Sequence, residues 1–184
     1  LLQILESRLD NVVYRDMRLL VDSQGYDGLT VTSSGMLTAT IEGFRISSLP
    51  YIANLWEGML PEPVLNNPVK MDYIPLFNVV WGDNGEVVEI TANYEESMYV
   101  LEEIFPKDKL IFLMCGGGGY AGMTKNLLVS LGWDENKIYN VGGYWYYEGK
   151  NNVEVKRTRD DETIYDFWKV TYHDIDFDNL HEVK

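Results

Sequence analysis

Residues 109–122 read KLIFLMCGGGGYAG, an apolar run that ends abruptly at a cysteine and four consecutive glycines. No polar residue interrupts the run at 110–114. Unbroken apolar runs of this kind are typical of strands covered on both faces, as in a parallel sheet between two layers of other elements. The stretch therefore predicts a buried strand with Cys115 at its carboxyl end.

A helix is predicted directly after the glycines. Its apolar residues recur at the spacing of one helix face: Met123, Leu127, Leu128 and Leu131. Gly132 follows them, in the position where a glycine commonly ends a helix. The order of strand, tight loop and helix is typical of α/β proteins, whose ligands lie at the carboxyl ends of the strands. We therefore predict an α/β protein with a mainly parallel central sheet flanked by helices.

The four successive glycines lose more chain entropy than alanines would, by about 0.5–1 kcal/mol each. A loop without Cβ atoms can turn its backbone N–H groups inward around an anion, and the N-terminal end of the following helix adds positive potential. The side chain placed to be that anion is Cys115, as a thiolate. A buried structural cysteine is the alternative. The glycine run favours the thiolate.

Two other kinds of glycine-rich loop have to be considered. Gly117, Gly119 and Gly122 fit the G-x-G-x-x-G spacing of a dinucleotide-binding loop, but the strand expected at 137–141 ends in glycines and not in the acidic residue of such sites. A nucleoside triphosphate loop needs Lys and then Ser or Thr after its last glycine, where this chain has Met123. Neither nucleotide site is predicted.

Residues 109–145 resemble a rhodanese-like domain, the fold of a family of sulfurtransferases. In that family a buried strand ends in the catalytic cysteine, a six-residue loop (here CGGGGY) surrounds the sulfur, and a helix follows. A further strand then leads to a glycine pair with aromatics, here NVGGYW at 140–145. The resemblance implies that Cys115 carries sulfur as a persulfide, with no metal or organic cofactor. It implies that the loop supplies amide donors: Gly116, Gly117, Gly118, Gly119 and Tyr120.

Two further matches lie nearer the N-terminus. Asp16 and Arg18 resemble the Asp-x-Arg with which the family closes an early strand, here expected at 12–14, and the resemblance gives them a structural role; a solvated ion pair is the alternative. Residues 38–44 resemble the family's G-H-I-P-G-A phrase, with Thr40 and Glu42 replacing its His and Pro. The phrases TIEGF and GGGGYA look like those of exported lipoprotein-type domains of Gram-positive bacteria, which implies an extracytoplasmic location.

Length, net charge and cysteine content limit the domain organisation, the binding partners and the disulfides that the chain can have. The 184 residues suit one domain, with an insertion at about 50–93 and a C-terminal extension at about 146–184. Without an initiator methionine or a signal peptide, the chain is expected to be a fragment. The net charge of −14 argues against nucleic-acid or anionic-membrane binding, because both need basic surfaces. No apolar run is long enough to span a bilayer, and one cysteine cannot form an intrachain disulfide.

The insertion is predicted to contain a β-hairpin. Residues 76–81 and 86–90 are rich in apolar and β-branched side chains, and they flank GDNG at 82–85, with Asn-Gly at the tip. Its aromatic side is expected to pack onto the domain, and binding of a protein partner is the alternative. Asn93 and Glu96 then form a predicted capping box for a helix that ends before the next proline.

Three segments carry weaker signals. Residues 19–35 are rich in Gly, Ser and Thr and predict a loop, and the charged stretch 156–162 predicts a solvated turn. Residues 174–178 alternate acidic and apolar side chains, which predicts an edge strand. An EF-hand calcium loop is rejected because Asn179 stands where that loop needs glycine. Neither histidine of the chain has a partner at metal-ligand spacing.

The loop departs from the family pattern in one respect. Rhodaneses that use thiosulfate place Arg or Lys in the loop, whereas 116–120 contain no cation, so we expect thiosulfate to be a poor substrate. A small persulfide donor and a thiol acceptor are the expected partners. One alternative is a rhodanese-like binding domain without turnover. A phosphatase or arsenate reductase is disfavoured, because it needs an arginine where this chain has Ala121.

Overall fold

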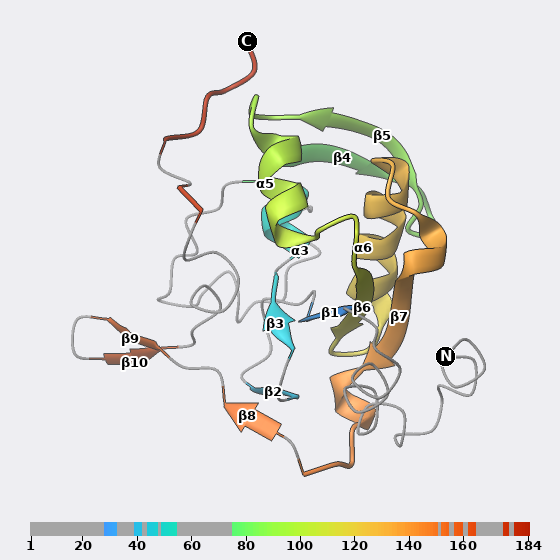
Figure 1. The fold of residues 1–184 in the computed structure, drawn as a ribbon, viewed down its shortest axis with the longest axis vertical. Coiled ribbons are helices and arrows are strands. Elements are labelled where there is room, and N and C mark those ends of the chain that lie inside the picture. The colour runs from blue at the N-terminus through green and yellow to red at the C-terminus, as the bar shows by residue number, and fades with distance from the viewer. Residues whose placement is uncertain are drawn as a thin grey trace.

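The computed structural model describes residues 28–32, 39–41, 44–47, 49–54, 75–150, 152–154, 157–159, 162–164, 175–176 and 179–184. Asp16, Arg18 and the strand expected at 12–14 lie outside these residues. Figure 1 shows the elements. In chain order they are β1 (Gly28–Thr32), β2 (Ala39–Ile41), β3 (Arg45–Ile46), α3 (Leu49–Ile52), β4 (Phe77–Trp81), β5 (Val87–Ala92), α5 (Ser97–Ile104), β6 (Leu110–Cys115), α6 (Gly119–Ser130), the short 3-10 helix η2 (Glu135–Lys137), β7 (Ile138–Gly143), the 3-10 helix η3 (Tyr144–Tyr146), β8 (Asn152–Glu154), β9 (Arg157–Arg159) and β10 (Glu162–Ile164).

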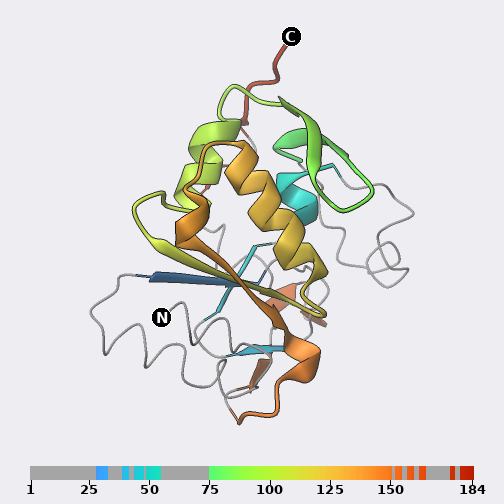
Figure 2. The same cartoon turned by 90° about the vertical axis from the view of Figure 1, so that its right-hand side faces the viewer.

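A four-stranded sheet in the order β3-β1-β6-β7 forms the centre of the fold, and all three of its strand pairs are parallel. Figure 2 shows α5, α6 and the β4–β5 hairpin on one side of these strands and β2 with β8 on the other. The chain is therefore an α/β protein, and the prediction of a mainly parallel central sheet is confirmed.

The side chains of β6 alternate between two buried clusters. Ile111, Leu113 and Cys115 belong to the larger cluster, which also contains side chains of α5 and α6. Phe112 and Met114 belong to a smaller cluster, which contains side chains of β2 and β7. Both clusters exclude water from the strand, which explains why β6 carries no polar residue. The predicted strand with two covered faces is confirmed.

The structure contains a strand, β1, inside the segment predicted to be a loop at 19–35. Residues 28–32 pair in parallel with 110–114 of β6. Leu29 and Val31 are buried in the larger cluster, at alternate positions of the strand. The prediction is wrong because the glycines and threonines of this stretch give a weak local signal. Backbone pairing with the strongly apolar β6 decides the conformation.

Two predictions near the C-terminus are also wrong. The stretch 156–162 contains paired strands, because β9 and β10 form an antiparallel pair in which Arg159 lies opposite Glu162. In the segment predicted to be an edge strand, the described residues Ile175 and Asp176 are not in a strand. Ile175 nevertheless packs against the larger cluster, so its inward position was inferred correctly from the alternation.

The carboxyl end of α6 is closed by the predicted glycine. Gly132 has a left-handed φ of +96°. Its amide donates to the carbonyl of Val129, and the amide of Trp133 donates to the carbonyl of Leu128, both at 3.0 Å. Together these bonds form a Schellman motif, which satisfies carbonyls that a helix end leaves unpaired. Leu128 and Trp133 are both buried in the larger cluster, so the motif also fixes where the chain leaves the helix.

The conformation of Gly132 leads to a stability prediction. A Cβ at this position meets no atom within 4 Å, so the cost of Gly132→Ala comes from the backbone alone. We expect a loss of about 1 kcal/mol in the free energy of unfolding, measured by urea denaturation. Gly132→Asn is the matched control and should lose less, since asparagine tolerates this conformation better. Equal stability of Gly132→Ala and the unmodified chain would contradict the prediction.

The predicted capping box at the start of α5 is wrong. The helix begins at Ser97, and its N-cap is Glu96, which makes no side-chain capping bond. Asn93 instead donates its side-chain amide to the carbonyl of Pro75 at 2.8 Å. Ser97 accepts the amide of Tyr94 at 3.1 Å and donates to a carbonyl of the hairpin start. The capping-box pattern in the sequence did not decide the structure here, because a hydrogen bond between the helix start and the hairpin uses the side chain of Asn93.

Glu96 binds the C-terminal segment of the described chain. Its carboxylate accepts the backbone amide of His181 at 2.9 Å and also pairs with Nδ1 of that ring. The amide of Glu95 donates to the carbonyl of His181, and the amide of Val183 donates to the carbonyl of Asn93, both at 2.9 Å. The last residues are thus held against the N-terminal end of α5.

This contact is expected to depend on pH. The side-chain hydrogen bond with Glu96 raises the pKa of His181, and the same bond lowers the pKa of Glu96. The pair is therefore complete between about pH 4.5 and 6.5, the ordinary values of the two groups. It is lost as pH rises through the raised pKa of His181 or falls through the lowered pKa of Glu96.

The measurement is the difference in Tm between the unmodified chain and Glu96→Gln as a function of pH. We expect the largest difference within that window and a smaller one above pH 8. Glu103→Gln, on the exposed surface of the same helix, is the control and should show no such profile. A constant difference from pH 5 to 9 would rule out the ionic contribution.

The predicted β-hairpin is confirmed as β4 and β5, which pair antiparallel. At its tip the amide of Gly82 donates to the carbonyl of Glu86, and Gly85 has a φ of +76°. The tip lies on α6, since Asn126 donates its side-chain amide to the carbonyl of Gly85 at 2.8 Å. Phe77, like other residues of β4, is buried in the larger cluster. The hairpin therefore packs onto the domain as expected.

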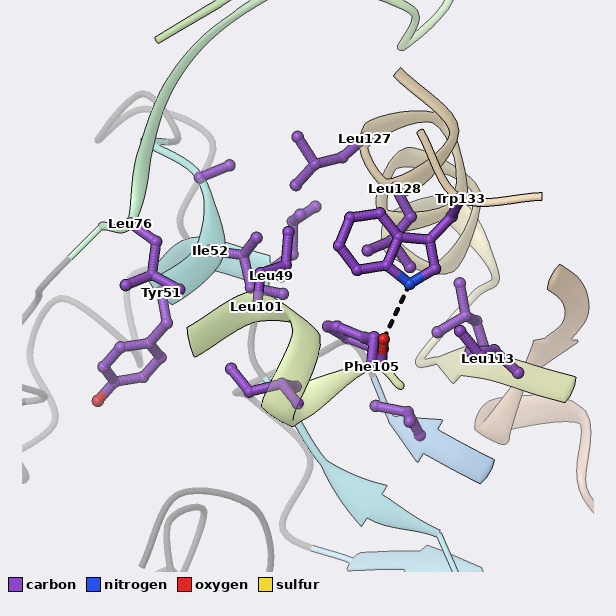
Figure 3. Packing of buried hydrophobic residues seen from close by; sticks show 14 of the residues in the cluster. Leu49, Tyr51, Ile52, Leu76, Leu101, Phe105, Leu113, Leu127, Leu128 and Trp133 are labelled. Atoms are coloured by element: carbon purple, nitrogen blue, oxygen red, sulfur yellow. Dashed lines mark hydrogen bonds between the residues drawn. The ribbon is translucent and has the colours of Figure 1, made fainter. Parts of the chain in front are cut away.

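Trp133 connects the ends of the two helices (Figure 3). Its indole is 4% exposed and donates from Nε1 to the carbonyl of Phe105 at 2.8 Å. That carbonyl lies just after α5, where helix carbonyls lack intrahelical partners. On the outside, Nζ of Lys107 lies 4.4 Å from the centre of the ring. One side chain therefore fills the core and satisfies a buried carbonyl.

Candidate functional site

The candidate site lies at the carboxyl end of β6, where the sequence places Cys115. The residue is only 2% exposed and faces the helical side of the sheet. Its Sγ accepts a hydrogen bond from the backbone amide of Gly118, with 3.0 Å between nitrogen and sulfur. The predicted interaction between a loop amide and the sulfur is therefore present. Within the described part of the chain, this is the one amide bonded to Sγ.

Gly118 has the conformation that makes this bond possible. Its φ of +92° is left-handed, and it is the N-cap of α6. The chain therefore reverses directly behind the sulfur, and the helix begins at Gly119 with its positive end near Sγ. A side chain at 118 would be strained and would lie 3.4 Å from the backbone of Gly142. Glycine is thus required here.

Gly142 and Gly143 form a glycine pair at the end of β7. This pair explains how the backbone of β7 comes close to the cysteine loop. A Cβ on Gly143 would lie 2.3 Å from the carbonyl oxygen of Gly116 and 2.7 Å from Cα of Gly117. Only glycine allows the two backbones to approach this closely. The amide of Trp145 donates to the same Gly116 carbonyl at 3.0 Å. The end of β7 and the start of η3 therefore form a wall against the cysteine loop.

Asn140 is a site residue to which the sequence analysis gave no role. Its Nδ2 donates to the carbonyl of Gly118 at 3.0 Å, and its Oδ1 accepts the amide of Gly142 at 3.0 Å. One half-buried side chain thus connects β7 to the residue whose amide contacts Sγ. The available signal was a polar residue near the end of a strand, next to the glycine pair.

The fixed carbonyls determine where the neighbouring amides point. In a trans peptide the C=O of one residue and the N–H of the next point in opposite directions. The carbonyls of Gly116 and Gly118 are bonded to residues of β7 and η3, so the amides of Gly117 and Gly119 point away from that wall. These two amides have no acceptor among the described residues. They are available to an anion at the loop.

Tyr120 ends the loop and lies near the sulfur. Burial raises the pKa of its phenol, and electrostatic interaction with Cys115 raises that pKa further. The phenol therefore keeps its proton at neutral pH. Tyr120 therefore adds a neutral, partly buried side chain to the site and no second charge.

Trp145 covers the outer surface of the loop. A Cβ on Gly116 would lie 2.7 Å from Cζ2 of its indole, and a Cβ on Gly117 would lie 3.3 Å from Cζ3. The two glycines thus leave room for the ring. The indole is nevertheless 69% exposed, and the neighbouring Tyr146 is also exposed. The smaller cluster holds Tyr144 and Tyr147 on the inner side, so η3 presents aromatics both inward and outward.

The remaining chemistry of the described residues is limited. They contain no group of three or more His, Cys, Asp or Glu side chains placed to hold a metal ion. None of the described helices has the length and apolar character needed to cross a membrane. The chain matches no family model, no curated protein and no solved structure, so its function has to be inferred from the geometry around Cys115.

Proposed function

We propose that this chain is a sulfurtransferase of the rhodanese-like type, in which Cys115 carries sulfane sulfur as a persulfide. The main observation in support is the 3.0 Å hydrogen bond from the Gly118 amide to Cys115 Sγ at the carboxyl end of β6. A parallel sheet, a glycine loop, a helix and a glycine pair beside the loop support the same family. The site combines a nucleophile with preoriented donors, which is what transfer through a charged sulfur needs.

The reaction has two displacement steps. The Cys115 thiolate attacks the outer sulfur of a donor R–S–SH, the bond between the two donor sulfurs breaks, and the electron pair leaves with R–S⁻. Cys115 then holds the transferred sulfur as Cys–S–SH. An acceptor thiolate R′–S⁻ attacks that sulfur, forms R′–S–SH and restores the Cys115 thiolate. Sulfur and charge balance in each step, and no metal or external oxidant takes part.

The donor is proposed to be a persulfide and not thiosulfate. Residues 116–120 supply amides and a neutral phenol, and no Lys or Arg side chain to pair with a sulfonate. The net charge of −14 also repels a small dianion at long range. We therefore propose that thiosulfate transfers sulfur to this chain only weakly.

A rhodanese-like binding domain without turnover is the second candidate. The observation that favours it is the burial of Cys115, which limits access of a reagent to Sγ. The hairpin also exposes Val80 and Val88, which a protein partner could cover. In this case Cys115 would be a core residue, and its contact with Gly118 would serve only the packing of the loop.

One experiment separates the two candidates. The purified protein is incubated with inorganic polysulfide and weighed intact by mass spectrometry. Because Cys115 is the only cysteine, a sulfur carrier should gain the mass of one sulfur atom, and Cys115→Ser should gain none. Transfer to an added thiol should then return the original mass. No gain, or an equal gain in Cys115→Ser, would rule out the carrier.

A further inference from the structure

The exposed indole of Trp145 is the least explained feature at the loop. A large aromatic ring is 69% exposed, although burial would stabilise the fold. The residue is nonetheless held against the loop, because the backbone amide of Trp145 donates to the Gly116 carbonyl and the six-membered part of its indole lies against Gly116 and Gly117. An exposed aromatic surface therefore lies on the two residues that directly follow Cys115.

We propose that Trp145 binds the organic part of the sulfur donor, and that this donor is a small persulfide with an uncharged, apolar group. This inference rests on the proposed sulfur transfer at Cys115. The Cys115 thiolate attacks the outer sulfur of the donor, and R–S⁻ leaves. The indole contributes contact with R before and after the sulfur–sulfur bond breaks, so it determines specificity and takes no part in bond making.

The burial of the sulfur favours a small donor. Cys115 is 2% exposed, and Trp145 lies over Gly116 and Gly117, the two residues that follow it. A slender reagent can bring its terminal sulfur to Sγ, whereas a cysteine on a protein surface would bring its own backbone and neighbours against the loop. The reacting sulfur of the donor enters the site, and its organic group stays outside, where the exposed face of the indole lies.

The charge around the loop favours an uncharged organic group. Residues 116–120 carry no charge, and Tyr120 keeps its proton at neutral pH. Residues 146–150 carry one acid and one base, Glu148 and Lys150, whose charges cancel. A donor with several carboxylates therefore finds no fixed positive group here, whereas an apolar donor finds the ring.

The test compares two donors on the full chain. Rates of Cys115 persulfide formation are measured by mass spectrometry with benzyl hydropersulfide, whose organic group is uncharged, and with glutathione persulfide, whose organic group carries carboxylates. We expect the unmodified chain to prefer the benzyl donor. Trp145→Ala should reduce that preference by about threefold to tenfold, and Trp145→Phe should retain most of it. Trp145→Arg should shift it toward glutathione persulfide.

Inorganic polysulfide, which has no organic group, reports whether the loop still works. Tyr99→Ala removes an equally exposed aromatic on α5 and should leave the preference unchanged. An unchanged preference in Trp145→Ala, with normal loading from inorganic polysulfide, overturns the inference and leaves the sulfurtransferase proposal standing. If the unmodified chain takes no sulfur from inorganic polysulfide, the proposed function fails, and this inference falls with it.

Discussion

Replacing Trp133 with alanine is expected to lower the free energy of unfolding by about 3–5 kcal/mol. The indole fills the space between the carboxyl ends of α5 and α6 and is almost fully buried. Its removal leaves a cavity beside Leu128 and leaves the Phe105 carbonyl without its 2.8 Å partner. Both losses act together, so the expected effect is larger than that of an ordinary core substitution.

Urea denaturation followed by far-UV circular dichroism measures this change. Trp133→Phe keeps most of the packing and removes the indole donor, so it should cost less than the alanine variant. Tyr99→Ala, at an exposed aromatic on α5, is the control and should change stability by less than about 0.5 kcal/mol. A loss below about 1 kcal/mol in Trp133→Ala would show that this side chain does not join the two helices.

Gly143→Ala is expected to displace the cysteine loop. The new Cβ would lie 2.3 Å from the carbonyl oxygen of Gly116 and 2.7 Å from Cα of Gly117, and backbone atoms cannot rotate out of its way. Overpacking of this kind typically costs about 1–3 kcal/mol of stability. Because the displaced residues precede Gly118, we also expect persulfide formation at Cys115 to slow by at least about tenfold, on the order of the loss of one oriented donor.

The matched control for stability is Gly119→Ala. A Cβ there meets no atom within 4 Å, and the position begins α6, where alanine favours the helix. Its free energy of unfolding should therefore match or exceed that of the unmodified chain. If Gly143→Ala unfolds like the control and accepts sulfur at the normal rate, the loop can move without consequence, and the wall formed by β7 is not needed.

The elements that the sequence predicted well are those with strong local signals. β6 has an unbroken apolar run, the hairpin has its turn residues, and α6 has a glycine at its end. β1 has only Leu29 and Val31 as inward side chains, and its partner lies about 80 residues away in the chain. The start of α5 was mistaken because Asn93 and Glu96 bind distant backbone groups of Pro75 and His181. Local patterns do not contain such contacts.

The same distinction holds at the site. The position of Cys115 at the end of a strand follows from the order of strand, loop and helix, and it was predicted. The glycine run was predicted to form the loop, but not that Gly118 would be the glycine with a left-handed φ. The roles of Asn140 and Trp145 depend on β7 lying beside β6, which brings residues more than 20 positions apart into contact. The sequence contained both residues inside a phrase resembling the family, but it did not show which backbone groups they hold.

The wall behind the loop has a consequence for how the site responds to charge. Folding already orients the loop dipoles, because β7 and η3 fix the Gly116 and Gly118 carbonyls independently of any reagent. Solvent around a free thiol must instead reorganise each time charge appears on sulfur. The loop backbone should therefore superimpose before and after sulfur is added. The backbone dipoles around Sγ then need no reorientation when its charge changes.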